Sequence, residues 1–184
     1  MTLYVAYGSN LCKSQMRQRC PTARSLGKFI FRECRLVFRS VADLEYDKTA
    51  ETPCGLYNIS RDDERALDGY EGVASGIYFK SEQTIMYEGG KVKALVYLMN
   101  SNGIYPPSKH YAEIIRRGYK DFGMDTKCLD EAIAHAYNNK SPDHGIARRR
   151  KRQIEGDLHR KLAENPNRET EPPLGLFSDG TPTS

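Results

Sequence analysis

The stretch from Tyr4 to Leu11 (YVAYGSNL) constrains the fold of this chain more than any other. It begins with the aromatic and β-branched alternation of a strand, over Leu3–Tyr7, and continues into the small polar turn Gly-Ser-Asn. A run with helical character follows over Leu11–Arg19, in which Leu11 and Met16 are the apolar residues. The stretch therefore predicts a strand, a turn and the start of a helix.

The turn after this strand also predicts a site for an anion. Gly8 permits backbone conformations that a side chain would disfavour, and Asn10 is a favourable N-cap residue. We therefore expect the backbone amides of Ser9 to Cys12 to point into open space at the N-terminus of the helix. Such a group of N–H donors binds carboxylates and oxyanions. The alternative is a plain connector between a strand and a helix.

Composition bounds the class of protein. A chain of 184 residues suffices for one domain with a sizeable core and an appendage. No apolar run approaches the ~18 residues of a membrane span, and no signal peptide is recognisable, so we expect a cytoplasmic protein without a membrane partner. Five cysteines with no Cys-x-x-Cys pair argue against a disulfide framework and a zinc site. A net charge of +4 is too small to imply a nucleic-acid partner.

The segments that follow the first helix predict strands and one further helix. Residues 28–40 carry two bursts of alternation, typical of one long strand or two short ones, and Pro53–Ile59 is another strand candidate. The polar, acidic segment Val41–Thr52 lacks periodicity and is interpreted as an exposed loop. Arg61–Tyr70 has the composition of a helix, with Ser60 as its N-cap.

The clearest hairpin lies in the middle of the chain. Gly76–Tyr87 and Lys91–Met99 both alternate, and Gly89-Gly90 is expected to form the turn between them. After Pro106-Pro107 the period becomes helical, and two helices are expected, the first capped by Ser108. Together these segments predict an α+β fold in which mostly antiparallel strands have helices at one end.

The last 44 residues differ from this body, so we divide the chain into a domain of residues 1–140 and an extension of residues 141–184. A narrow apolar stripe at helical spacing runs through a charged stretch and consists of Ile154, Leu158 and Leu162. The Pro- and Thr-rich ending is typical of disorder. The basic run Arg148–Arg152 suggests an acidic or nucleic-acid partner, but the extension carries eight Lys or Arg and seven Asp or Glu, which favours a solvated charged helix.

Few residues are in a sequence context that suits catalysis. The four histidines are scattered, and none is four positions from another, which argues against a metal site. Ser9 lacks the Gly-x-Ser-x-Gly elbow of a serine nucleophile. A thiol enzyme using Cys12 or Cys54 is an alternative, although no signature flanks either cysteine. Glu71 follows an acidic helix and precedes a predicted strand; if it is buried, its pKa rises and suits proton transfer, whereas the alternative is a surface glutamate in a turn.

Three motifs stand in a fixed order along the chain. They are Tyr7–Leu11 (YGSNL), Tyr70–Val73 (YEGV) with Ser75–Tyr78 behind it, and Tyr97–Met99 (YLM) followed by Pro106–Tyr111 (PPSKHY). Together they resemble the γ-glutamylcyclotransferase family in order and in approximate spacing, over roughly two thirds of the chain. The resemblance implies a small mixed, mostly antiparallel β-barrel flanked by helices.

The resemblance also implies an activity. Glu71 matches the family's general acid/base, which assists an intramolecular attack of the substrate's α-amine on its γ-glutamyl carbonyl and releases 5-oxoproline. The residues that match the family's substrate site are Tyr4, Val5, Ala6, Tyr7, Gly8, Ser9, Asn10 and Tyr111. The implied partner is a small γ-glutamyl compound, with no metal and no organic cofactor, and the protein is expected to be a monomer or a homodimer.

Two points stay open at the level of sequence. The identity of the leaving group depends on loops such as Val41–Thr52 and Asn100–Pro106, which the resemblance does not fix. A non-catalytic domain of the same fold, which binds an anionic ligand at the turn after the first strand and an acidic or nucleic-acid partner at Arg148–Arg152, is the alternative function.

Overall fold

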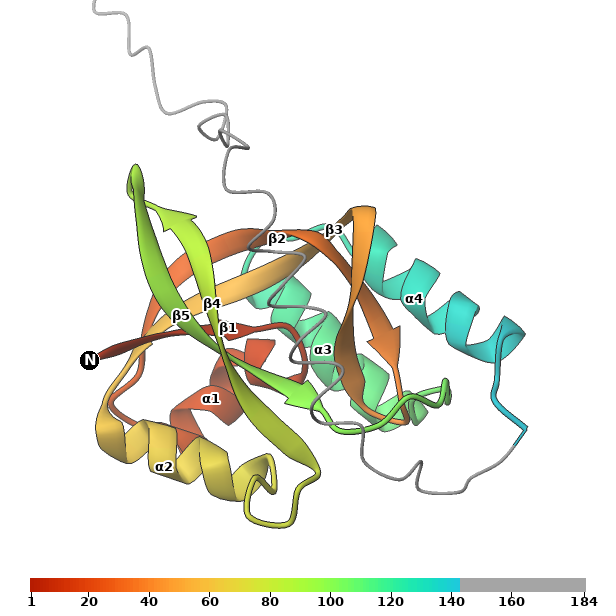
Figure 1. Ribbon diagram of the computed structural model, residues 1–184, viewed down its shortest axis with the longest axis horizontal. Helices are drawn as coiled ribbons and strands as arrows, with labels where there is room; N and C mark the ends of the chain where they lie inside the picture. Colours follow the sequence, from red (N-terminus) through yellow and green to blue (C-terminus); the bar gives the residue numbers. More distant parts are fainter. Residues whose placement is uncertain (143–184) are drawn as a thin grey trace, which may run out of the picture.

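The computed structural model describes residues 1–142 (Figure 1). The strands are β1 (Thr2–Ala6), β2 (Arg24–Phe38), β3 (Ala42–Ile59), β4 (Tyr78–Tyr87) and β5 (Gly90–Met99). The helices are the short 3-10 turn η1 (Ser9–Leu11), α1 (Lys13–Arg19), α2 (Arg61–Tyr70), α3 (Lys109–Asp121) and α4 (Lys127–Asn138). The predicted charged helix, the predicted disordered tail and the basic run Arg148–Arg152 lie outside the described residues.

The five strands form one sheet in the order β2-β3-β1-β5-β4. Every neighbouring pair is antiparallel except β1 and β5, which run parallel, and this confirms the predicted mixed, mostly antiparallel α+β class. Figure 1 shows α1 and α2 side by side at one end of the sheet and α4 at the opposite side. The expected barrel is not closed, because β2 and β4 are the two edges of the sheet and do not pair with each other.

The segment predicted as an exposed loop, Val41–Thr52, forms instead the first part of β3 from Ala42 onward. It pairs with β2 from Phe38 opposite Ala42 to Arg32 opposite Glu51. Its acidic side chains lie beside arginines of β2, as in the ion pair between Arg32 and Glu51. Cross-strand pairs of opposite charge stabilise a sheet. The prediction was wrong because a strand whose polar side chains have partners on another strand looks like a loop when its own sequence is considered alone.

The predicted strand, turn and helix at the N-terminus are confirmed, but the cap of the helix differs. The 3-10 turn η1 separates β1 from α1, whose N-cap is Cys12 and not Asn10. A carboxylate distant in the sequence caps the first turn of α1: the Lys13 N–H donates to Oδ2 of Asp121 at 2.8 Å. The amides of Leu11 and Cys12 donate to the carbonyls of Gly8 and Ser9 within η1. The predicted row of open amides is therefore reduced, because half of it forms the hydrogen bonds of the turn itself.

The predicted helix caps are confirmed at two positions. Ser60 and Asp63 form a reciprocal capping box at the start of α2, and the Ser108 hydroxyl accepts the Tyr111 N–H at the start of α3. The hairpin of β4 and β5 is confirmed as well, with its turn one residue earlier than predicted. Glu88 and Gly89 both have positive φ there, at 49° and 78°, as a tight two-residue hairpin turn requires.

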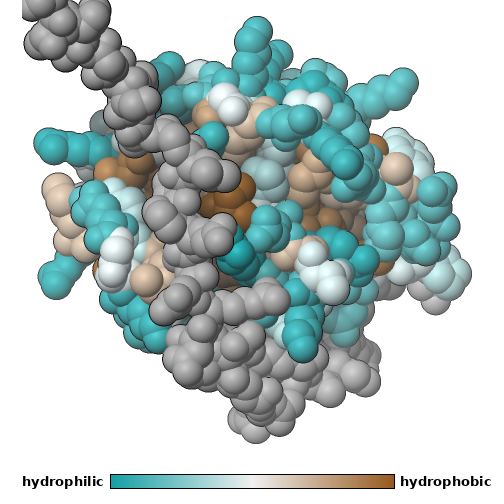
Figure 2. Space-filling model, turned by 90° about the horizontal axis from the view of Figure 1, so that it is seen from above, coloured by the Kyte–Doolittle hydropathy of each residue, from teal (hydrophilic) through white to brown (hydrophobic). Residues whose placement is uncertain are grey.

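One apolar core joins the sheet to the helices. Its largest fully buried side chains include Tyr97, Tyr119, Phe38, Leu11 and Met16. The face in Figure 2 has hydrophilic side chains around its rim and hydrophobic side chains gathered nearer its middle. No helix within residues 1–142 is both long enough and apolar enough to cross a membrane.

Candidate active site

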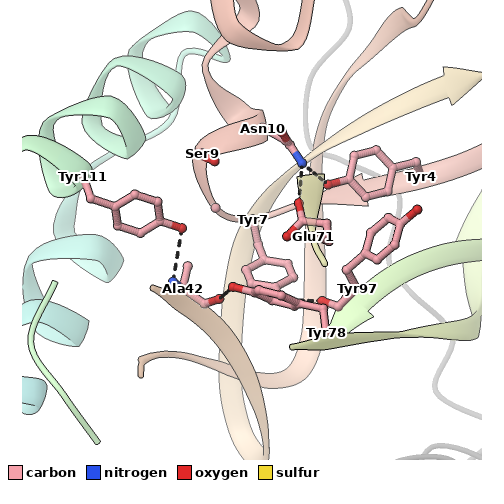
Figure 3. Close-up of a pocket in the computed structure, with 10 residues that line it drawn as sticks. Tyr4, Tyr7, Ser9, Asn10, Ala42, Glu71, Tyr78, Tyr97 and Tyr111 are labelled. Carbon is pink, nitrogen blue, oxygen red and sulfur yellow. Dashed lines mark hydrogen bonds between the residues drawn. The ribbon is translucent and has the colours of Figure 1, made fainter. Parts of the chain in front are cut away.

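A hollow opens where the end of β1 meets the end of α2 (Figure 3). Its cavity volume is about 30 Å³, far below the roughly 300–1,000 Å³ of ligand pockets, so the hollow is narrow. The residues that line the hollow come from β1, β3, β4, β5, α3 and η1, from the link between β1 and η1, and from the position after α2. They are Tyr4, Tyr7, Gly8, Ser9, Asn10, Ala42, Glu71, Tyr78, Tyr97 and Tyr111.

Glu71 is placed by the way in which α2 ends. It is the C-cap of that helix, and the next residue, Gly72, has a φ of +63°. The Gly72 N–H donates to the carbonyl of Gly69 and the Val73 N–H to that of Asp68, at 3.2 and 3.0 Å. These two bonds form a Schellman motif, in which glycine adopts the left-handed conformation at low cost. The motif stops the helix so that the Glu71 side chain points into the hollow.

The Glu71 carboxylate has a neutral hydrogen-bond donor. Nδ2 of Asn10 lies 3.0 Å from Oε1 of Glu71 and 2.7 Å from the Tyr4 hydroxyl. Oδ1 of Asn10 in turn accepts a hydrogen bond from Nη1 of Arg19 at 2.6 Å. Burial raises the pKa of Glu71, while the Asn10 hydrogen bond and the positive charge of Arg19 oppose the rise. The net rise brings the pKa of this carboxyl closer to neutrality, which suits a group that accepts and returns a proton.

Phenol groups make up most of the remaining wall. The Tyr7 hydroxyl donates to the carbonyl of Tyr97 at 2.5 Å, and the Tyr78 hydroxyl donates to the carbonyl of Ala42 at 2.9 Å. The Ala42 N–H donates to the Tyr111 hydroxyl at 3.2 Å, so Tyr111 keeps its own proton for another acceptor. Burial raises the pKa of the phenols of Tyr7, Tyr78 and Tyr111. The wall is therefore uncharged near neutral pH, and of these three phenols only Tyr111 has a proton without an acceptor among the described residues.

Most of the residues predicted for the site do meet at the hollow. Those that line it are Tyr4, Tyr7, Gly8, Ser9, Asn10, Glu71 and Tyr111. Val5 and Ala6 do not line it; both are fully buried in β1, where they pair with Leu56 and Gly55 of β3.

Four contributors were not predicted as site residues. Tyr78 and Tyr97 belong to two of the motifs noted above, so their motif positions were an available signal. Ala42 was missed because its segment was interpreted as a loop. Arg19 does not line the hollow, and its contact with Asn10 depends on how α1 folds back along η1, which no local pattern indicates.

The structure disfavours the thiol alternative. Neither Cys12 nor Cys54 lines the hollow. The Cys54 thiol is fully buried and donates to the carbonyl of Thr52, and burial raises the pKa of Cys54 well above its usual value. A buried, protonated thiol is a poor nucleophile. Within the part of the chain that the structure describes, no group of three or more His, Cys, Asp or Glu side chains is placed to hold a metal ion.

Comparison with known proteins agrees with this architecture. Residues 54–130 match the AIG2-like family. The γ-glutamylcyclotransferase of Bos taurus is 30% identical over 148 residues, which cover 66% of this chain and 72% of the bovine protein. The chain belongs to the γ-glutamylcyclotransferase family. The human γ-glutamylcyclotransferase is 29% identical over 139 residues, with the same coverage.

The fold is also that of the γ-glutamylcyclotransferase family. A solved structure described as a γ-glutamyl cyclotransferase superposes with a TM-score of 0.64 at 24% identity and covers 87% of this chain and 98% of its own. Glu71 and Tyr111 lie within the segment that matches the AIG2-like family, whereas Tyr4 to Asn10 precede it. The hollow therefore joins residues from this segment to residues from the start of the chain.

Proposed function

We propose that this protein is a γ-glutamylcyclotransferase that releases 5-oxoproline from a small γ-glutamyl compound, with Glu71 as its general acid and base. The observation that carries the proposal is the carboxylate of Glu71, partly buried at the end of α2, held by Asn10 and surrounded by neutral phenols. Bovine and human relatives that bear the name of this activity support it. The proposal includes a small γ-glutamyl substrate and no membrane or nucleic-acid partner. It also includes a cytoplasmic location and a monomeric or homodimeric state.

The first step is a proton transfer. Glu71 takes a proton from the substrate's α-ammonium, and the free amine then attacks the γ-carbonyl and closes a five-membered ring. The nucleophile and the electrophile belong to one molecule, so the protein has chiefly to hold the folded conformer. Well-oriented intramolecular reactions reach effective molarities on the order of 10⁵–10⁸ M. A narrow hollow with converging hydroxyl and amide groups suits that task.

The second step returns the proton. As the bond between the γ-carbon and the leaving nitrogen breaks, the carboxylic acid of Glu71 protonates that nitrogen and becomes a carboxylate again. The ring nitrogen gives up its second proton to the released amine, which leaves as an ammonium group. The oxygen of the γ-carbonyl carries negative charge while the ring closes, and preorganised donors stabilise such charge. The donor that we assign to it is the Tyr111 hydroxyl, which accepts the Ala42 N–H and donates to no acceptor among residues 1–142. These steps move protons and one acyl group and require no redox group.

The test is direct detection of 5-oxoproline by mass spectrometry. The purified protein is incubated with a panel of γ-glutamyl amino acids, γ-glutamyl amines and γ-glutamyl isopeptides, in parallel with Glu71→Gln. We expect release by the wild type alone, because the loss of an acid/base group typically costs about 10²–10⁴-fold in rate. The rank order of the panel then identifies the class of leaving group. No release by a folded wild-type protein, or undiminished release by Glu71→Gln, would contradict the proposal.

A further inference from the structure

Arg19 contacts the turn that carries Asn10, the hydrogen-bond donor of the candidate acid/base. It is the last residue of α1 and is only partly exposed. Its Nη1 lies 2.6 Å from Oδ1 of Asn10 and 3.0 Å from Oγ of Ser9, and its Nη2 lies 2.9 Å from Oε1 of Gln15. One guanidinium therefore fixes two residues of the turn that lines the hollow, and a third side chain holds the guanidinium itself.

Arg19 also reaches the residue next to Glu71. Its guanidinium carbon lies 4.6 Å from the centre of the Tyr70 ring, within the range of a cation–π contact. Tyr70 is the last residue of α2 and Glu71 follows it. Arg19 thus contacts the side chain of Asn10 and the ring of Tyr70, the residue before Glu71.

The contact with Asn10 has a chemical consequence for the direction of its amide. A guanidinium has only donors, so it pairs with the oxygen of the amide and not with the nitrogen. With Oδ1 held by Arg19, Nδ2 must face Tyr4 and Glu71. The reverse orientation would place the amide oxygen against the carboxylate and the amide N–H groups against the guanidinium, and both contacts would be repulsive.

We propose that Arg19 is a positioning residue for the acid/base: it holds the Asn10 amide in the orientation that donates to Glu71 and thereby favours the ionised carboxylate that accepts the substrate's proton. The inference rests on the function proposed above for Glu71. Two effects act in the same direction. The Asn10 hydrogen bond and the positive charge of Arg19 both lower the pKa of Glu71 against the larger effect of burial, which raises it.

Among residues 1–142, none of the other groups that line the hollow around Glu71 carries a positive charge. From the neighbouring elements they are the phenols of Tyr4, Tyr7, Tyr78, Tyr97 and Tyr111. Burial raises the pKa of these phenols, so they are uncharged near neutral pH. Asp43 of β3 lies behind Tyr7 and Tyr78, and its carboxylate is paired with Arg39 at 2.7 Å. Opposite charge near a carboxyl favours its ionised form, and here Arg19 supplies that charge.

The kinetic test compares Arg19→Gln and Arg19→Lys with the wild type. We expect Arg19→Gln to lower kcat at neutral pH by about 10- to 100-fold, the effect of a small misplacement of catalytic groups, with a smaller change in KM. The acid limb of its pH profile should move to higher pH. Arg19→Lys keeps a positive donor but cannot serve Asn10, Ser9 and Gln15 together, so it should recover part of the loss. Arg17→Gln, at an exposed position of α1, removes the same charge and is expected to match the wild type.

A second measurement does not depend on turnover. Carbon-13 NMR of glutamate side-chain carboxyls, with Glu71→Gln to assign the Glu71 signal, follows its titration in the wild type and in each variant. We expect the midpoint to rise in Arg19→Gln and to rise less in Arg19→Lys. In an Asn10→Ala background the effect of Arg19→Gln should shrink, since the mediating amide is gone.

The outcomes separate the two proposals. An inactive wild type whose Glu71 signal still responds to Arg19→Gln contradicts the proposed function but not the role of Arg19. An active wild type whose Glu71 midpoint and acid limb are the same in both Arg19 variants overturns the inference. If Arg19→Gln does not fold, Arg19→Lys and Asn10→Ala, compared with the wild type by NMR, decide the question alone.

Discussion

Nδ2 of Asn10 donates to Oε1 of Glu71 across 3.0 Å, although 61 positions separate the two residues in the sequence. The bond joins η1, the turn after β1, to the C-cap of α2. A carboxylate that is partly buried at such a junction costs free energy when it is ionised, unless a donor compensates for the lost water. The protonation of Glu71 is therefore linked to the stability of the fold.

This linkage predicts that Glu71→Gln stabilises the protein at neutral pH while it abolishes activity. Because burial raises the pKa of Glu71 in the folded state, its ionised form destabilises the wild type at pH values above that folded pKa. A neutral glutamine has no such cost, and its amide oxygen can still accept from Asn10. Functional sites often reduce stability in this way.

The measurement is the free energy of unfolding in urea as a function of pH, for the wild type and for Glu71→Gln. The stability of the wild type relative to the variant should fall as the pH rises through the folded pKa of Glu71. Below the ordinary pKa of a glutamic acid the two proteins should have similar stability, since both side chains are then neutral. A variant that is less stable than the wild type at pH 7 would contradict this account of Glu71.

The two phenols that contact Ala42 should respond differently to the loss of a hydroxyl. Tyr78 donates to the Ala42 carbonyl, whereas Tyr111 accepts from the Ala42 N–H, and the Tyr111 proton is the one assigned above to the substrate. We expect Tyr111→Phe to lower kcat/KM about tenfold or more, because a hydrogen bond to developing charge is lost. Tyr78→Phe should cost mainly stability, by about 1–3 kcal/mol, because it leaves a buried carbonyl without a donor.

Steady-state kinetics and urea unfolding on the same two preparations separate these effects. Equal losses of kcat/KM in the two variants would mean that the Tyr111 proton has no special role. The comparison is informative because both changes remove a single oxygen from a tyrosine of the same hollow.

Features governed by neighbouring residues were predictable from the sequence. The caps at Ser60 and Ser108 and the end of α2 before Gly72 follow from side-chain and backbone preferences within one turn of helix. The end of that helix also placed Glu71 at an element boundary. Asn10 was expected as an N-cap and, through the resemblance, as a residue of the substrate site. Its hydrogen bond to Glu71 was not predicted, because nothing local connects the two.

Features that depend on distant partners were not predictable. The first part of β3 is rich in acidic residues, and its strand character depends on the arginines of β2 that face it. The amides of Leu11 and Cys12 were expected to be open, but a 3-10 turn uses them. Arg19 looked like one of several basic residues of α1, and its contact with Asn10 exists only in the folded chain.

A buried ion pair anchors the turn that leads to Ala42. Nε of Arg39 donates to Oδ2 of Asp43 at 2.7 Å, both side chains are less than 10% exposed, and Oδ1 of Asp43 accepts the Met99 N–H. Removal of one member of a buried pair typically costs about 3–5 kcal/mol. Nη2 of Arg39 keeps a second contact, 3.2 Å to Oε2 of the partly exposed Glu45, so the loss should lie at the lower end of that range. We therefore expect Asp43→Ala to destabilise the protein by about this amount.

Urea unfolding of Asp43→Ala, with Glu82→Ala as a control, measures the difference. Glu82 pairs with Lys93, and both side chains are more than 60% exposed, so its loss should cost less than about 1 kcal/mol. The double variant Arg39→Met/Asp43→Leu should be more stable than Asp43→Ala, because apolar replacement removes both charges together. If Asp43→Ala and Glu82→Ala have equal effects, the buried pair does not anchor the turn.

The two glycines of helices α3 and α2 provide a matched test of how η1 is held. A Cβ at Gly118 would lie 2.3 Å from Cβ of Leu11 and 2.7 Å from the backbone nitrogen of Cys12, whereas a Cβ at Gly69 would meet nothing within 4 Å. In a helix interior, alanine is more stable than glycine by up to about 1 kcal/mol, so Gly69→Ala should stabilise the protein. Gly118→Ala should instead destabilise it by about 1–3 kcal/mol, because the clash with the backbone of η1 outweighs the helical preference.

Gly118→Ala should also lower kcat/KM, since the displaced turn carries Asn10. Unfolding in urea and steady-state kinetics of both variants check the pair, and a stabilised, fully active Gly118→Ala would mean that α3 does not fix the position of the turn.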